Sequence, residues 1–184
     1  MRASGLWAAG IVVAIGATAG YAAPARTPAV TAKAVLMSAD GKEVGTVLLT
    51  QTKAGVRLRV NVNGLSPGEH GFHIHAVGKC EPPFTSAGPH FNPNERKHGL
   101  QSREGHHAGD MRSLRVLKSG KATATLTNAG VTLEKDKPNS LFKEGGTAIV
   151  VHAQPDDQLT DPSGNSGDRI ACGVVTEDVK SAAR

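Results

Sequence analysis

The chain has 184 residues and a formal charge of +5, and it contains 22 glycines and 10 prolines but only four Phe, one Trp and one Tyr. This length fits one ordinary domain and excludes a large multidomain enzyme, while the many turn-forming residues argue against a helical bundle. Basic residues are scattered, the longest adjacent group being Arg96 and Lys97, and no aromatic platform is interleaved with them. The sequence therefore argues against a nucleic-acid partner.

The N-terminus has the pattern of an export signal. A long uncharged stretch contains an apolar core from Leu6 to Gly16, and small residues follow that core. We expect a signal peptide over residues 1–22, cleaved after Ala19 or Ala22, and a flexible lead-in over residues 23–30. The rival interpretation, an uncleaved membrane anchor, fits less well because small residues end the apolar core. The sequence thus predicts an exported protein, periplasmic in a bacterium, with no stable membrane insertion after cleavage.

From Thr31 onward the sequence alternates short apolar segments with turn signals such as Asp40-Gly41 and Asn63-Gly64. No amphipathic stretch of helical length lies between these segments, so the fold class is all-β: an eight-stranded antiparallel Greek-key barrel or sandwich over residues 31–176, followed by a C-terminal tail over residues 177–184. The eight predicted strands are Ala34–Ser38, Gly45–Thr50, Val56–Val62, Gly71–Ala76, Leu114–Leu117, Ala122–Leu126, Thr147–Ala153 and Ile170–Val175.

Two long segments have no strand pattern, residues 77–113 and residues 154–168, and long loops in a compact domain are usually functional. Residues 128–146 show no informative pattern. The chain has only two cysteines, Cys80 and Cys172, and in an exported chain one structural disulfide is the simplest interpretation. Metal ligation and free thiols are the alternatives, and two lone cysteines without close spacing make a poor metal site.

All eight histidines lie between positions 70 and 152. On a strand, residues two apart project from the same face, so His73 and His75 share one side while their apolar neighbours take the other. His152 ends the apolar run that begins at Ala148, where a buried strand would hold it rigidly. The pattern predicts a cluster of imidazoles backed by the hydrophobic core.

The first long loop carries His90, His98 and the sequence His107-Ala108-Gly109-Asp110, in which the His-x-x-Asp spacing lets two ligands converge from one turn. Imidazoles with a single carboxylate suit tetrahedral zinc, and several imidazoles without thiolate also suit copper, so two metals fit this composition.

Some of these residues have simpler interpretations. We favour a structural role for His70, and we choose His107 over His106 because of its spacing to Asp110. Arg169, considered alone, is an ordinary surface cation.

Together these motifs resemble those of the copper-zinc superoxide dismutases, especially the exported bacterial members, over residues 31–175. The matching segments are Gly71-Phe72-His73-Ile74-His75, Ala87-Gly88-Pro89-His90-Phe91-Asn92-Pro93, Lys97-His98-Gly99, His107-Ala108-Gly109-Asp110, Val150-Val151-His152 and Gly164-Asn165-Ser166-Gly167-Asp168-Arg169-Ile170-Ala171-Cys172-Gly173.

This resemblance implies that two metals share the ring of His90 and that Asp156 hydrogen-bonds one ligand of each metal. It also implies a disulfide between Cys80 and Cys172, and an active-site role for Arg169. The implied copper ligands are His73, His75, His90 and His152, and the implied zinc ligands are His90, His98, His107 and Asp110.

The implied activity is conversion of superoxide to dioxygen and hydrogen peroxide by copper redox cycling, with His90 and Arg169 as catalytic residues and zinc as a structural and electrostatic partner. The alternative is an exported copper or zinc buffer or donor without turnover. Residues 153–168 contain four Asp and no Lys or Arg, so this loop is not expected to steer the superoxide anion as lysines do in eukaryotic relatives. The sequence does not decide between a monomer and a homodimer.

Overall fold

A computed structural model describes residues 30–178. The predicted signal peptide, residues 23–29 of the predicted lead-in and residues 179–184 of the predicted tail lie outside these described residues. None of the described residues belongs to a helix long and apolar enough to cross a membrane.

The described chain is built almost entirely of β-strands, with one short 3-10 turn, η1 (Thr85–Ala87). All eight predicted strands are present, and two further short strands, β4 and β10, accompany them. The strands are β1 (Thr31–Ser38), β2 (Glu43–Thr52), β3 (Gly55–Asn63), β4 (Gly68–His70), β5 (Phe72–His75), β6 (Leu114–Val116), β7 (Lys121–Asn128), β8 (Ala148–His152), β9 (Arg169–Val174) and β10 (Thr176–Glu177).

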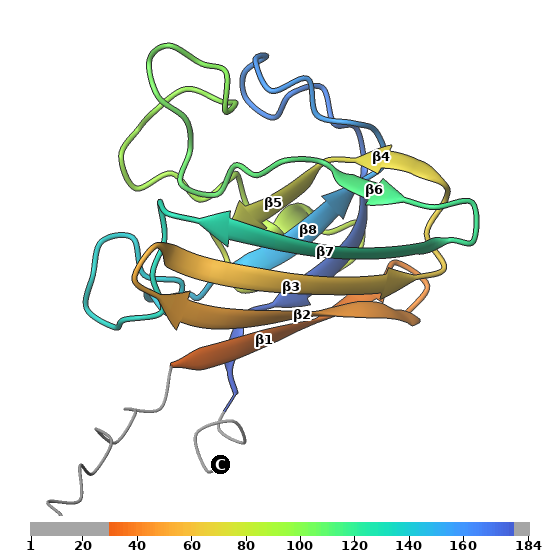
Figure 1. Cartoon of the computed structure of the whole chain (residues 1–184), viewed down its shortest axis with the longest axis horizontal. Coiled ribbons are helices and arrows are strands. Elements are labelled where there is room, and N and C mark those ends of the chain that lie inside the picture. The colour runs from red at the N-terminus through yellow and green to blue at the C-terminus, as the bar shows by residue number, and fades with distance from the viewer. Residues whose placement is uncertain (1–29, 179–184) are drawn as a thin grey trace, which may run out of the picture.

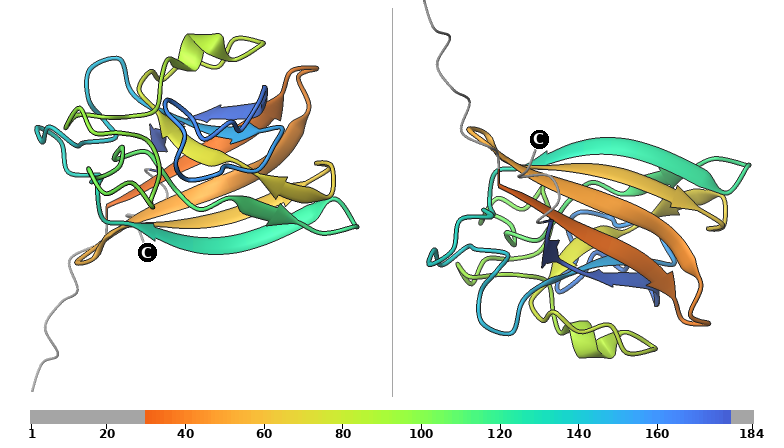
Figure 2. Two further views of the ribbon diagram at one scale, coloured as in Figure 1. Left: turned by 90° about the horizontal axis from the view of Figure 1, so that it is seen from above. Right: turned by 90° about the horizontal axis from the view of Figure 1, so that it is seen from below.

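The main sheet is antiparallel and has the order β5-β8-β9-β1-β2-β3-β7. Strand β10 lies outside this order and pairs with β1. It curls into a half-barrel, and β4 and β6 form a separate two-stranded sheet (Figures 1 and 2). The non-consecutive neighbours, such as β9 beside β1, agree with the predicted Greek-key class.

Strand β3 shows why these segments form a sheet around a core. Val56, Leu58, Val60 and Val62 are buried, whereas the residues between them face outward. This period of two matches the alternation of side chains along a strand. Each buried aliphatic side chain contributes about 1.5–3 kcal/mol relative to an exposed one.

Strand β8 is buried on both faces, which explains its unbroken apolar sequence. Ile149 and Val151 belong to the main core, while Ala148 and Val150 pack with Phe84 under the loop that follows β5. Strand β8, which ends at His152, is therefore held between two packed layers.

Three long loops extend from this framework: residues 76–113, residues 129–147 and residues 153–168. The first and third are the predicted functional loops, and Figure 1 shows them together at one end of the molecule. They are joined directly, because the backbone N–H of His98 donates to Oδ1 of Asp161 at 2.6 Å.

A disulfide between Cys80 and Cys172 anchors the first loop to β9, as predicted, with the two Cα atoms 5.6 Å apart. The cross-link closes 92 residues of chain. Loss of unfolded-chain entropy on closing a loop of this length is about 4–5 kcal/mol in the chain-entropy account, whose mechanism is model-dependent.

Candidate metal centre

Three groups of side chains in the described residues offer ligand atoms that lie within 4.8 Å of one another; the two four-residue groups share His90, and the third joins His73 and His98 to Asp156. The first group contains only imidazoles and the second adds a carboxylate. The first is His73, His75, His90 and His152, and the second is His90, His98, His107 and Asp110. The structure thus brings together all seven residues that the sequence suggested as metal ligands.

The first group is assembled by strand pairing. His73 and His75 lie on β5, and His152 ends β8, which pairs antiparallel with β5. His90 is in the first long loop but is held beside β5 by an isolated bridge to His75, and the N–H of its neighbour Phe91 donates to the carbonyl of Ile74 at 2.8 Å. Backbone hydrogen bonds on the β5 edge therefore position His90, in addition to the disulfide that the sequence suggested.

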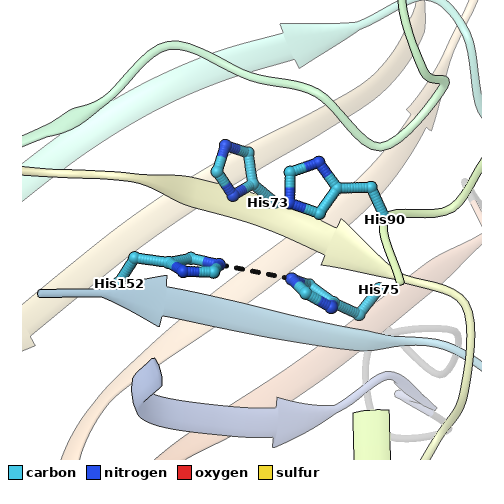
Figure 3. A group of neighbouring side chains, drawn as sticks. All are labelled: His73, His75, His90 and His152. Carbon is cyan, nitrogen blue, oxygen red and sulfur yellow. Dashed lines mark hydrogen bonds between the residues drawn. The ribbon is translucent and has the colours of Figure 1, made fainter. Parts of the chain in front are cut away.

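The rings of His75 and His152 face each other through nitrogens that carry no proton in the neutral rings. Nδ1 of His75 donates to the carbonyl of Gly88 at 2.8 Å, and Nδ1 of His152 donates to the carbonyl of Gly167 at 3.1 Å. Each neutral imidazole has one N–H, so both Nε2 atoms present lone pairs. These Nε2 atoms are only 3.3 Å apart (Figure 3). Two lone pairs this close repel each other unless a proton or a metal cation is shared between them, so the arrangement fits a cation site.

His73 and His90 complete this arrangement with two buried nitrogens that have no hydrogen-bond partner. Nε2 of His73 donates to Oδ2 of Asp156 at 2.6 Å, which leaves its Nδ1 unpartnered. Nδ1 of His90 lies 2.8 Å from Oδ1 of Asp110, which leaves its Nε2 unpartnered. Unsatisfied buried polar atoms are rare and costly, so these two nitrogens fit the ligation of a cation.

In the second group three ring nitrogens converge on one oxygen. Oδ1 of Asp110 lies 2.8 Å from Nδ1 of His90, 3.1 Å from Nδ1 of His98 and 3.2 Å from Nδ1 of His107. The other oxygen, Oδ2, accepts the backbone N–H of Gly99 at 2.8 Å and that of His107 at 3.0 Å. Three imidazoles and one carboxylate are a donor set that suits four-coordinate zinc.

The pKa shifts of these groups fit cation-binding sites: His90 and His152 of the first group are neutral donors, and the carboxyl of the second group is ionised. Burial lowers the pKa of His90 to about 4 and that of His152 to about 3, so both rings are neutral at pH 7. Burial also opposes charge on His98, but the nearby carboxylates of Asp110 and Asp156 outweigh it and raise the pKa of His98 to about 9. Burial likewise opposes ionisation of Asp110, yet hydrogen bonds from His107 and His90 and the nearby ring of His98 hold the pKa of this carboxyl well below its usual range.

Asp156 connects the two groups. Its Oδ2 accepts from His73 in the first group, and its Oδ1 accepts from Nε2 of His98 in the second at 3.0 Å. Both ring orientations are thereby set with Nδ1 facing the ligand cluster. Gly164 packs directly against this carboxylate, and a Cβ at that position would overlap Oδ1 of Asp156. Sequence reasoning missed Gly164, although it opens one of the segments that matched the family.

Arg169 lies beside the first group at the start of β9. Its register partner on β8 is His152, at a point where the ladder shifts register. The guanidinium donates to the carbonyls of Phe84 and Gly88, both at 2.7 Å, so its position is fixed and it is only partly buried. Arg169 lines an opening of about 460 Å³ with Pro83, Thr85, Gly167 and Asp168.

The acidic residues of the third long loop are mostly engaged in holding that loop. Asp157 accepts from the backbone N–H groups of Leu159 and Thr160, at 2.9 and 2.8 Å, and Asp161 holds His98 and pairs with Lys97 at 3.2 Å. Their hydrogen bonds explain why a loop with four Asp and no Lys or Arg keeps a defined shape.

Two histidines lie outside both groups. The ring nitrogens of His70 lie 2.8 and 2.9 Å from the carbonyl oxygens of His152 and Ser66, and Nε2 also lies 3.5 Å from the hydroxyl of Ser66, so this buried ring has a structural role. Nδ1 of His106 lies 2.7 Å from the carbonyl of His107, and the ring belongs to neither ligand group. His107, selected by its spacing to Asp110, is the member of the pair that lies in the second group.

A curled antiparallel sheet that holds two four-residue ligand groups around one shared imidazole defines a protein with paired metal sites. The family model described as "Copper/zinc superoxide dismutase (SODC)" matches residues 43–175, and the chain belongs to this family.

Several known proteins are similar to this chain over most of their own length. "Superoxide dismutase [Cu-Zn] 1" of Aquifex aeolicus is 50% identical over 142 residues, covering 76% of this chain and 84% of that protein. "Superoxide dismutase-like protein YojM" of Bacillus subtilis is 40% identical over 143 residues, covering 76% of this chain and 73% of that protein. The crystal structure of a SOD-like protein from Bacillus subtilis has a TM-score of 0.75 at 39% identity and covers 78% and 97% of the two chains.

Proposed function

We propose that this protein is an exported superoxide dismutase, in which His73, His75, His90 and His152 hold copper while His90, His98, His107 and Asp110 hold zinc. One observation carries the proposal: four imidazoles from β5, β8 and the first loop turn nitrogens without protons toward one point, and one of these rings also belongs to the second group. All-imidazole donors suit copper, and three imidazoles with one carboxylate suit zinc.

Bound copper would supply the one-electron redox chemistry by which two superoxide ions and two protons become one dioxygen and one hydrogen peroxide. The side chains supply orientation and protons. Nδ1 of His90 is held toward Asp110, so Nε2 is the ring atom that can carry a proton on the side of the first group. His90 is thus the proposed proton carrier for the peroxide product.

Asp110 and Asp156 keep these rings in place. Asp110 gathers three imidazoles of the second group around one oxygen, and Asp156 sets the tautomers of His73 and His98. A carboxylate that orients a ligating ring in this way raises metal affinity. Neither carboxylate needs to contact the substrate.

Arg169 would attract and orient the superoxide anion. Its guanidinium is anchored by two backbone carbonyls and remains partly accessible at the opening beside His152. A fixed cation at an accessible opening favours entry of a small anion. A buffer or donor protein without turnover would not need such a cation, and this alternative is not favoured.

Export to the periplasm is part of the proposal. The uncharged N-terminal stretch supports a signal peptide over residues 1–22, ahead of a β-domain that begins at residue 31. The Cys80–Cys172 disulfide supports an oxidising compartment.

The decisive experiment is metal analysis of the purified mature protein combined with a superoxide-removal assay before and after chelation. We expect about one copper and one zinc per chain, with activity lost on chelation and restored by adding back copper and zinc. A protein that binds both metals without removing superoxide would be a metal buffer and would contradict the proposal.

A further inference from the structure

A second cavity approaches the metal centre from the side of the zinc group. It has a volume of about 410 Å³ and is lined by residues of all three long loops, among them His90 and His107. Figure 2 shows the first loop and the loop of residues 129–147 running close together, and two hydrogen bonds join them: Gly78 N–H to Gly145 O at 2.7 Å and Lys143 Nζ to Ala76 O at 3.1 Å. The volume is within the range of small-molecule sites.

The walls of this cavity are mostly apolar and stiff. Four prolines line it, Pro89, Pro93, Pro138 and Pro162, together with Phe91. A proline ring has one fixed backbone torsion and little side-chain freedom, so few torsions are frozen when an apolar ligand packs against it. Preformed apolar walls of this kind favour a flat or compact hydrocarbon group.

Lys143 provides a positive charge at this cavity. Its ammonium group donates to the carbonyls of Ala76 and Glu144, at 3.1 and 2.8 Å. An ammonium group has three N–H donors, so one remains available. No carboxylate within residues 30–178 pairs with Lys143, in contrast to Lys42, Lys79, Lys97 and Lys135. The two carbonyls hold the cation in place and leave its charge unbalanced.

His107 adds a second donor. Its Nδ1 faces Asp110, and no described residue accepts a hydrogen bond from its Nε2. When Nδ1 is a zinc ligand, the ring proton is on Nε2. The side chain is 9% exposed and lines the cavity, and Nε2 is the ring nitrogen that does not face Asp110.

We propose that the cavity lined by Lys143, His107 and the four prolines binds a small carboxylate with an apolar body, whose oxygens pair with Lys143 and His107 and whose hydrocarbon part packs on the prolines. This cavity shares no lining residue with the opening at Arg169. The bound carboxylate would contact a zinc ligand from outside and leave the proposed superoxide entrance free.

Benzoate is the probe, because it combines one carboxylate with a flat ring, and benzamide is its neutral counterpart. Binding is measured by calorimetry on the zinc-loaded, copper(I) protein, and the site is located from backbone amide shifts in NMR spectra. The variant is Lys143→Gln, and the matched control is Lys137→Gln, which changes an exposed lysine of the same loop. Pro138→Trp, which fills the cavity and keeps Lys143, is a second variant in case Lys143→Gln does not fold.

We expect benzoate to bind with a Kd on the order of 1 mM, as for a ligand of this size, and benzamide to bind at least about tenfold more weakly. Lys143→Gln or Pro138→Trp should weaken benzoate binding about tenfold or more, whereas Lys137→Gln and Arg169→Gln should leave it unchanged. Amide shifts should centre on Phe91 and Glu144.

Absence of binding at 10 mM, equal binding of benzamide, or loss of binding in Arg169→Gln with shifts centred on Asp168 would overturn the proposal. Because binding is measured directly, the result is independent of whether the protein removes superoxide.

Discussion

Arg169 and His75 donate to the same acceptor, the carbonyl oxygen of Gly88, at 2.7 and 2.8 Å. The oxygen thus sets the position of the guanidinium and the tautomer of a proposed copper ligand together. Gly88 lies at the end of η1, in the loop that the disulfide anchors to β9. Backbone geometry in this loop therefore couples the proposed anion-binding cation to the first ligand group.

Reversal of the charge at Arg169 tests its role in attracting the substrate. Arg169→Glu should lower the rate of superoxide removal at low salt by roughly tenfold or more and should weaken its dependence on ionic strength, because the nearest fixed cation becomes an anion. The rate is measured from low to physiological ionic strength at equal copper and zinc content. Arg57→Glu, an exposed change on β3, is the control and should behave like the unmodified protein. Equal rates for both variants would contradict a steering role for Arg169.

The Asp156 carboxylate is expected to act through the rings that it orients. In Asp156→Asn only one atom of the side chain accepts, so the hydrogen bonds to His73 and His98 cannot both be kept. Metal affinity should fall roughly 10- to 100-fold, measured by competition with a chelator of known affinity. Asp40→Asn, in an exposed hairpin, is the control. If Asp156→Asn retained both metals with unchanged affinity, the positioning role would be wrong.

Substitution of single histidines separates a shared ligand from ligands of one metal. His90→Ala should weaken binding of both copper and zinc, whereas His107→Ala should mainly weaken zinc binding, because only His90 belongs to both groups. Copper and zinc contents are measured after equilibration with limiting metal. His106→Ala, the adjacent histidine, should lose neither metal. A zinc loss in His106→Ala as large as that in His107→Ala would reverse the assignment.

The disulfide is expected to contribute to stability and also to the geometry at Arg169. A Cys80→Ser, Cys172→Ser double variant should lose about 4 kcal/mol of unfolding free energy, measured by urea denaturation. The loop that supplies the Phe84 and Gly88 carbonyls would also lose its attachment to β9, so the rate of superoxide removal should fall even where the protein is still folded. A stable variant with full activity would show that packing of Phe84 and Val150 alone holds the loop.

The candidate ligands could be found from the sequence because their signals are local. Alternation in residues 56–62 predicts β3, and a spacing of two puts His73 and His75 on one face of β5. The His-x-x-Asp spacing distinguished His107 from His106 because one turn brings a residue and its third neighbour together. The resemblance to a family supplied what spacing could not, namely that His90 belongs to both ligand groups and that Asp156 hydrogen-bonds one ligand in each group.

Only the tertiary structure decided features that depend on backbone atoms and on segments far apart in the chain. No residue pattern marks the Gly88 carbonyl as a common acceptor. Nor does any pattern predict that His90 forms a β-bridge with His75 at the edge of β5. Residues 128–146 showed no informative pattern, yet they deliver Lys143 and Pro138 to a cavity beside His107. The physical reason is that strand periodicity reports which side of a chain meets the core, whereas contacts between loops depend on turns and packing that no local pattern encodes.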